Sequence, residues 1–339
     1  MTEEPAGRVD VPPGDAAAAR DGGSRRAWPA LRAAVARAVV GADEPLRLLA
    51  VALLADGHAL LEDVPGVGKT LLARAFARAL DLEFARVQGT PDLLPTDITG
   101  SSLLQGGELR FVRGPVFTNL LLVDEVNRAT PRAQSALLEA MQERQVSIEG
   151  HTHPLPDPFL VVATQNPIEL EGTFALPEAQ LDRFLVRIRL GYPEPAAERA
   201  IASRYQREAE PLALVEPVLD EAGVRALRAA TRTVTVSDEV EAYVVALVRA
   251  TRDWPDVELG ASPRASVALY RAGQAWALLA GRDFVRPDDV KAVAPAVLAH
   301  RLILDVERSL RGATPEQVLE AVLASVPVPP VIEGSARTA

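Results

Sequence analysis

One stretch, Leu60–Thr70, constrains the fold of this chain more than any other: it reads Leu-Leu-Glu-Asp-Val-Pro-Gly-Val-Gly-Lys-Thr. It begins in an apolar run, passes through a loop of small residues, and leads into a segment through Leu80 that has neither Gly nor Pro. Strand, glycine loop and helix in this order predict a phosphate-binding loop, or P-loop, because backbone N–H groups and a helix N-terminus favour an anion. We expect the phosphates to lie against Pro65, Gly66, Val67, Gly68, Lys69, Thr70 and Leu71.

Two side chains of this loop have specific expected roles. Lys69 would reach the β- and γ-phosphates of a nucleotide, and the Thr70 hydroxyl would be a ligand of Mg²⁺. One position departs from the pattern G-x-x-x-x-G-K-[ST], because this chain has Asp63 in place of the first glycine. That position starts the turn and need not touch phosphate, so the prediction stands. The alternative is a chance Gly-Lys-Thr at a strand–helix turn.

The bulk properties exclude several classes of protein. The 339 residues are enough for two domains, and the absence of cysteine excludes disulfides, a thiolate nucleophile and zinc–thiolate sites. The net charge of −10 argues against broad nucleic-acid affinity, although a local basic pore could exist within it. No signal peptide is visible, and the most apolar stretch, Leu46–Leu61, contains charges and is too short to cross a bilayer. We expect a soluble cytoplasmic protein without a membrane span.

Apolar runs separated by helical patterns predict an α/β fold in the first part of the chain. Residues 1–27 lack periodicity and are expected to be a disordered tail. Helical patterns run from Trp28 to Val39 and from Leu46 to Gly57, and Thr130-Pro131 starts another helix. The expected strands are the run before the P-loop, Glu83–Gln88, Leu120–Val123, Phe159–Thr164 and Leu185–Leu190. Together they predict a parallel five-stranded sheet with helices on both faces.

Two exposed β-hairpins are expected to interrupt this pattern. The first joins Ile98–Leu104 to Glu108–Arg113 through Gly106-Gly107, and the second spans Val146–His153. His151 and His153 would share one strand face of the second hairpin. They lack a third ligand, so we expect a solvated hairpin there rather than a metal site.

The character of the chain changes after Tyr192. Helical patterns replace strands almost entirely, at Ala196–Gln206, Asp220–Thr231, Ser237–Asp253, Ser262–Ala280 and Pro287–Val297. We therefore expect an α/β domain over residues 28–192, an all-helical domain over 193–325 and a flexible tail over 326–339.

Several polar side chains fall at the carboxyl ends of the predicted strands, where parallel sheets bind ligands. They are Lys69, Asp124, Glu125 and Asn166. An Asp-Glu pair is usually a solvated turn, but after a buried strand and downstream of a P-loop it indicates nucleotide hydrolysis. Asp124 would hold Mg²⁺ and Glu125 would polarise the attacking water.

At this point the residues resemble the AAA+ ATPases, and specifically the MoxR family. The resemblance covers about Trp28 to Ser325 and is carried by the runs Leu61–Thr70, Gln88–Gly100, Leu121–Gln145, Ala163–Phe184 and Gly260–Ala265. It implies a P-loop NTPase sheet with hairpin insertions, an all-α lid domain, and ATP and Mg²⁺ as cofactors. In related proteins such hairpins face the pore or the partner.

The resemblance also implies roles for single residues. Asn166 looks like sensor 1, which orients the water against the γ-phosphate. The alternative is a structural Asx-Pro turn, which would have the same sequence. Arg183 looks like the arginine finger that reaches the nucleotide of the neighbouring subunit; a salt bridge to Asp182 is the alternative. Arg264 looks like sensor 2, which couples the γ-phosphate to the position of the lid.

Four further positions are less specific. Val40 and Gly41 resemble the segment that touches adenine. Gln88 has the position of a switch that holds Glu125 away from the water, with a plain surface residue as the alternative. Arg128 could face a subunit interface, and no role is assigned to it.

The function implied is that of a ring-forming ATPase, expected to be a homo-hexamer, that remodels or activates a client protein. Proteins of this type resemble chaperones for metalloenzyme maturation or complex assembly and work with a partner that bears a von Willebrand factor A domain. One alternative is an ATP-gated assembly scaffold with incidental turnover. Another is a nucleic-acid motor, which the acidic charge and the absence of a recognisable basic arm disfavour.

Overall fold

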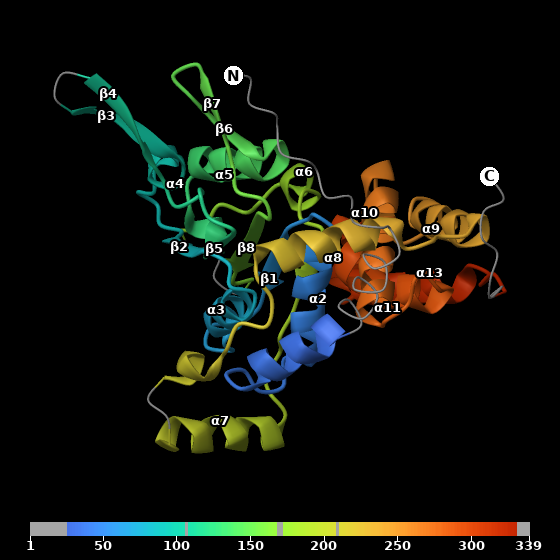
Figure 1. Cartoon of the computed structure of the whole chain (residues 1–339). Helices are drawn as coiled ribbons and strands as arrows, with labels where there is room; N and C mark the ends of the chain where they lie inside the picture. The colour runs from blue at the N-terminus through green and yellow to red at the C-terminus, as the bar shows by residue number, and fades with distance from the viewer. Residues whose placement is uncertain (1–25, 106–107, 168–171, 208–209, 331–339) are drawn as a thin grey trace, which may run out of the picture.

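The computed structural model describes residues 26–105, 108–167, 172–207 and 210–330. Its centre is a parallel five-stranded sheet of order β2-β5-β8-β1-β9 (Figure 1). The strands are β1 Ala59–Glu62, β2 Phe84–Gln88, β5 Leu120–Asp124, β8 Leu160–Gln165 and β9 Val186–Ile188. This confirms the predicted α/β fold. β9 is shorter than the predicted Leu185–Leu190, because the N–H groups of Leu190 and Gly191 turn to the Asp63 carboxylate instead.

Alternate residues of the strands point into two separate apolar cores. Leu120 and Leu122 of β5 belong to a core shared with α2 (Asp43–Leu54), α3 (Lys69–Ala79) and the lid helices. Leu121 and Val123 belong to a second core, which α5 (Pro131–Glu143) covers. A strand buried on both faces has to be continuously apolar, which explains the unbroken run in the sequence.

The helices before the P-loop differ slightly from the prediction. A helix covers residues 26–36, so it reaches two residues into the expected tail, whose residues 1–25 lie outside the described part. α2 begins at Asp43, earlier than the apolar pattern suggested, because Pro45 is tolerated in a first helical turn. α5 begins where predicted: the Thr130 hydroxyl accepts the N–H of Ala133 at 3.4 Å.

Both predicted hairpins are present and project from the same end of the α/β part (Figure 1). The first pairs β3 (Gly100–Gln105) with β4 (Glu108–Arg113), and its Gly106-Gly107 turn lies outside the described residues. Ile98 was expected in this hairpin but belongs to a short helix, α4 (Pro95–Thr99), whose Asp97 carboxylate accepts the N–H of Leu94 at 2.9 Å.

The second hairpin pairs β6 (Gln145–Ile148) with β7 (His151–Pro154). The expectation of a fully solvated hairpin is wrong for His153, whose ring stacks on Phe111 of the first hairpin at 4.2 Å. His151 is exposed, as expected. The stacked pair joins the two insertions to each other.

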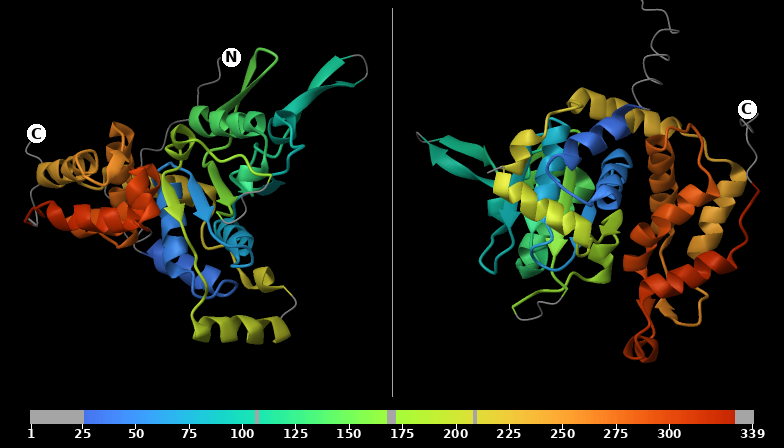
Figure 2. Two further views of the ribbon diagram at one scale, coloured as in Figure 1. Left: turned by 180° about the vertical axis from the view of Figure 1, so that it is seen from behind. Right: turned by 90° about the horizontal axis from the view of Figure 1, so that it is seen from below.

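The second half of the chain is mainly helical, as predicted. Its helices are α7 Pro195–Arg207, α8 Glu221–Thr233, α9 Asp238–Ala250, α10 Pro263–Leu279, α11 Pro287–Leu298, α12 Val306–Leu310 and α13 Pro315–Ser325, with 3₁₀ turns at Pro211–Leu214 and Ala299–Arg301. α8 to α13 pack beside the α/β part, whereas α7 lies away from these helices (Figure 2). Ala197 of α7 faces Gly41. No helix within the described ranges is long and apolar enough to cross a bilayer.

Four elements of this half were not predicted: β10, β11, α12 and α13. β10 (Val257–Leu259) and β11 (Ile303–Leu304) form a two-stranded antiparallel sheet too short to show a period in the sequence. α13 was also missed, although the Thr314 hydroxyl and the Gln317 side chain cap its first turn reciprocally. Residues 326–330 are in neither helix nor strand, and 331–339 lie outside the described part.

Candidate active site

The P-loop connects the end of β1 to the start of α3. Gly66 and Gly68 have φ angles of +85° and +92°, in the left-handed region that favours glycine, so these positions require the residue type that the sequence supplies. The Lys69 ammonium donates to the carbonyl oxygens of Asp63 at 2.6 Å and Val64 at 3.4 Å. Lys69 is therefore folded back over the loop, at the positive end of α3.

Asp63 explains the departure from the glycine pattern. Its Oδ1 accepts the N–H of Val64 at 2.8 Å, and its Oδ2 accepts the N–H groups of Leu190 at 2.7 Å and Gly191 at 2.6 Å. Three backbone donors on one carboxylate are bonds that glycine could not make. Asp63 thus attaches the start of the P-loop to the segment that leaves β9.

Asp124 lies at the carboxyl end of β5 and is almost fully buried. Its Oδ2 accepts from the Thr70 hydroxyl at 3.1 Å and from Arg86 Nε at 2.9 Å, and its Oδ1 accepts from the Thr164 hydroxyl at 2.8 Å. A hydroxyl and a carboxylate oxygen at this separation are donors of the kind that Mg²⁺ prefers. Thr70 and Asp124 therefore fit a magnesium site next to the P-loop.

Glu125 follows Asp124 and has a φ of +54°, which is unusual for a residue with a side chain. Its Oε2 accepts from Gln88 Nε2 at 2.8 Å and lies 3.3 Å from an Arg128 guanidinium nitrogen. Gln88 Oε1 in turn accepts from Arg86 at 3.0 Å. One chain of contacts therefore connects Asp124, Arg86, Gln88 and Glu125.

Asn166 is buried immediately after β8. The β8 end lies beside the P-loop, because the Asp63 N–H donates to the Gln165 carbonyl oxygen at 3.3 Å. The structure thus brings Lys69, Thr70, Asp124, Glu125 and Asn166 to one edge of the sheet, where the sequence places them.

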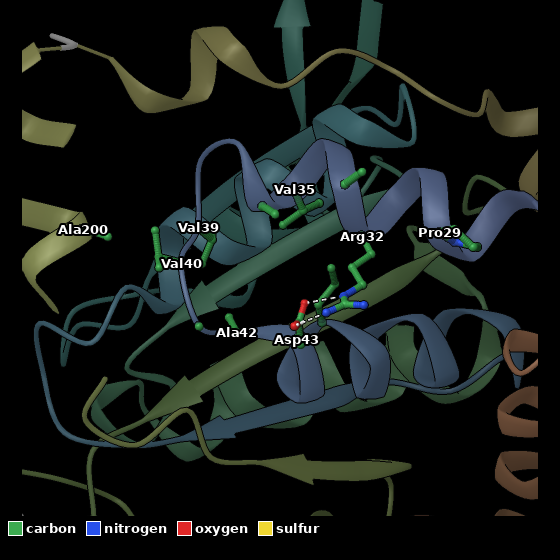
Figure 3. A pocket seen from close by; sticks show the side chains of 12 residues that line it. Pro29, Arg32, Val35, Val39, Val40, Ala42, Asp43 and Ala200 are labelled. Atoms are coloured by element: carbon green, nitrogen blue, oxygen red, sulfur yellow. Dashed lines mark hydrogen bonds and ion pairs between the residues drawn. The ribbon is translucent and has the colours of Figure 1, made fainter. Parts of the chain in front are cut away.

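Val40 and Gly41 line a separate cavity of about 460 Å³, together with the helix over residues 26–36 and Ala200 of α7 (Figure 3). An ion pair between Arg32 and Asp43, at 2.6 Å, forms part of its wall. Residues 63–71 are all described, and none of them lines this cavity.

Arg183 and Arg264 lie together, but not beside the P-loop. Both line a cavity of about 310 Å³ whose other residues include His58, directly before β1, and Leu185, directly before β9. These are the amino ends of the strands, whereas the P-loop follows the carboxyl end of β1. The four residues of β1 separate the two sites by roughly 13 Å.

The charges of this second cavity do not cancel. It contains five arginines and two aspartates, and Asp56 and Asp182 are bound by Arg144 and Arg301 at 2.9 and 2.7 Å. In the described part of the chain, no carboxylate pairs with the remaining three, Arg183, Arg264 and Arg271. The alternative ion pair between Arg183 and Asp182 is therefore not formed, and the cavity suits an anion.

Sequence reasoning missed several residues of these sites, among them Arg144 and Arg301 of the arginine cavity. Thr164 and Arg86 bind Asp124, Arg271 joins the arginine cavity, and Gly89 lets β2 approach β5 closely, because a Cβ there would lie 2.2 Å from the Glu125 carbonyl oxygen. A signal existed for two of them. Thr164 is the polar end of an apolar run, and Arg86 shares a strand face with Gln88.

His58, at the wall of the arginine cavity, makes stability depend on pH. Burial first, and then the nearby charge of Arg144, lower its pKa from 6.5 to about 3; its Nδ1 accepts the Val161 N–H at 3.0 Å. The unfolded chain binds this proton and the folded one does not, so the contribution of His58 to stability is complete above about pH 6.5 and falls toward pH 3 by about 1.4 kcal/mol per pH unit.

Urea unfolding of the wild type and His58→Gln between pH 7 and pH 4 tests this. The variant is expected to lose about one proton of pH dependence, whereas His151→Gln, at an exposed histidine, is expected to match the wild type. Equal slopes for wild type and His58→Gln would contradict the assignment.

The comparisons with known proteins agree with these observations. The model of the ATPase family associated with various cellular activities (AAA) matches residues 58–186, and that of the AAA lid domain matches residues 249–322. The uncharacterized protein YeaC of Bacillus subtilis is 46% identical over 295 residues, which are 86% of this chain and 92% of that protein. The chaperone MoxR1 of Mycobacterium tuberculosis is 46% identical over 310 residues, which are 88% and 81% of the two chains.

A solved structure supports the same conclusion. A protein of Cytophaga hutchinsonii described as an inferred ATPase matches with a TM-score of 0.87 at 38% identity, over 93% of this chain and 99% of that one. The α/β part and the helical lid thus each match a known family model. This chain belongs to the MoxR family of AAA+ ATPases.

Proposed function

We propose that the chain is an Mg²⁺-dependent ATPase that assembles into a homo-oligomeric ring and hydrolyses ATP between subunits. The observation that carries this is the position of Arg183 and Arg264 at the opposite ends of the strands from their own P-loop. An arginine cavity suited to an anion, placed where its own nucleotide cannot be, is complementary to the nucleotide edge of a second subunit. The site is then complete only at an interface, and by resemblance the ring is a hexamer.

Each side chain has a role in this site. Lys69 would leave the Asp63 carbonyl to bind the β/γ-phosphates, and Thr70 and Asp124 would hold Mg²⁺, which offsets the charge of the phosphates. Glu125 would take the water proton and Asn166 would orient the water, while Arg183 and Arg264 of the next subunit would stabilise the transition-state charge.

Further roles are proposed on the same grounds. Gln88 would restrain Glu125 until the site is assembled, since the two side chains are hydrogen-bonded at 2.8 Å. Val40 and Gly41 would bind adenine in the cavity of Figure 3. Residues 28–192 would act as the nucleotide-binding domain and 193–325 as the lid.

We propose that the ring remodels or activates client proteins in the cytoplasm, together with a partner that bears a von Willebrand factor A domain. The support is the family membership and the name chaperone of the Mycobacterium tuberculosis relative. The two joined hairpins, with exposed Leu104 and Leu109, provide a surface for such contacts.

The test is ATP turnover per subunit measured against protein concentration. Turnover is expected to rise as subunits associate, in parallel with the oligomer fraction seen by mass photometry, and to require Mg²⁺. Tight ATP binding with near-zero turnover at every concentration, in the assembled protein, would favour the ATP-gated scaffold instead. Turnover that is independent of concentration in a monomeric protein would contradict the interfacial site.

A further inference from the structure

We infer that two consecutive acids at the base of the P-loop, Glu62 and Asp63, couple the state of the nucleotide loop to the position of the lid. This rests on the proposed function, which supplies the nucleotide. Glu62 precedes the P-loop pattern and Asp63 replaces its first glycine. Both bind groups in the segment that connects the sheet to the lid.

Asp63 binds the first residues of the segment that connects β9 to the lid. One carboxylate oxygen accepts the N–H groups of Leu190 and Gly191, and Gly191 has a φ of +69°. Gly191 starts the connection that leads through residues 192–194 to α7 and then to the lid. The direction in which the chain leaves β9 is therefore fixed by the residue that begins the P-loop.

Glu62 binds the lid itself through two arginines. Its carboxylate lies 3.3 Å from Arg187 and 2.9 Å from Arg189 of the β9 segment, and the same two guanidinium groups lie 2.8 and 2.9 Å from Glu316 in the first turn of α13. Glu62 and Arg187 are mostly buried, with 11% and 14% of their side chains exposed. Arg189 and Glu316 are more exposed, at 54% and 35%, so the Glu62–Arg187 pair is the weakly screened part of this network.

Lys69 connects Asp63 to the nucleotide. Its ammonium donates to the Asp63 carbonyl oxygen at 2.6 Å. Lys69 therefore holds the backbone of Asp63, while the Asp63 side chain binds the Gly191 N–H. When Lys69 turns toward phosphate, that bond to Asp63 is released. The segment at Gly191 and the Arg187–Arg189–Glu316 cluster are the first groups to respond.

The test uses Asp63→Asn and Asp63→Gly. All three bonds of the carboxylate come from N–H donors, so the amide group of Asn must face at least one of them with its own N–H. Asp63→Gly restores the usual first residue of the P-loop pattern and removes all three bonds. Glu194→Gln, at an exposed linker carboxylate, is the matched control.

Two readouts separate coupling from simple support of the fold. Hydrogen exchange of the Leu190 and Gly191 amides is expected to be about tenfold faster in Asp63→Gly, the value for one lost hydrogen bond. Asp63→Asn can keep both of these bonds by turning its amide N–H toward Val64, so it is expected to lose only the Val64 bond. The chain has no cysteine, so Arg74→Cys on α3 and Glu320→Cys on α13 give two unique dye sites. A change in energy transfer on adding MgATP is expected in the wild type and in Glu194→Gln, and its loss is expected in Asp63→Gly.

Nucleotide affinity, measured with a fluorescent ATP analogue, is expected to stay within about threefold of wild type, because no phosphate contact is removed. An Asp63→Gly variant that binds nucleotide and keeps the full energy-transfer change would overturn the inference. So would a wild type that binds nucleotide without any such change. A wild type that binds no nucleotide would instead contradict the proposed function.

Discussion

Replacing Glu125 with Gln is expected to lower ATP turnover by about 10²–10⁴-fold while nucleotide binding is retained, because the amide cannot accept the water proton. The side chains are isosteric, and the residue remains at the end of β5 beside Gln88 and Arg128. Phosphate release at saturating ATP measures the loss, and a fluorescent nucleotide measures the binding. Glu139→Gln, at an exposed carboxylate of α5, is the control.

The variant protein should also accumulate in its ATP-bound assembled form, which makes it suitable for trapping clients. Turnover of Glu125→Gln within about threefold of wild type would mean that another group activates the water, and the assignment of Glu125 would be wrong.

Replacing Arg183 with Ala is expected to lower turnover by about 10³–10⁵-fold, the range for loss of an arginine that stabilises phosphoryl transfer from a neighbouring subunit. Arg183 Nη1 also donates to the Leu138 carbonyl at 3.1 Å, so the melting temperature must be measured in parallel. Arg183→Lys should rescue little, because an ammonium lacks the fork of the guanidinium. Arg311→Ala, at an exposed lid arginine, should be neutral.

A second outcome would separate catalysis from assembly. If Arg183→Ala fails to form the oligomer at concentrations where the wild type is assembled, its loss of turnover reports the interface alone. Normal assembly with normal turnover would exclude the arginine-finger role.

Much of the α/β part was predictable, because its signals are local. Buried parallel strands require unbroken apolar runs, and a P-loop requires small residues at fixed positions. Asp124, Glu125 and Asn166 could be placed together because the carboxyl ends of parallel strands share one edge of a sheet.

The rest depends on contacts between segments far apart in the chain. The sequence identifies Arg264 on the first turn of a helix, but its place beside Arg183 depends on how the lid packs against the sheet. The stack of His153 on Phe111 likewise requires two insertions to meet. In the sequence, Asp63 is only a departure from the glycine of the P-loop pattern. The structure shows that its carboxylate binds the backbone N–H groups of Leu190 and Gly191.

The most direct test of the central claim is to mix Arg183→Ala subunits with Glu125→Gln subunits, each inactive alone. An Arg183→Ala subunit still has Glu125 and its P-loop, and a neighbouring Glu125→Gln subunit supplies Arg183. In an equal random mixture about a quarter of the interfaces are complete, so turnover should return to roughly a quarter of wild type. A mixture that assembles but stays as inactive as its parts would show that Arg183 does not act on a neighbour's nucleotide, which contradicts the account.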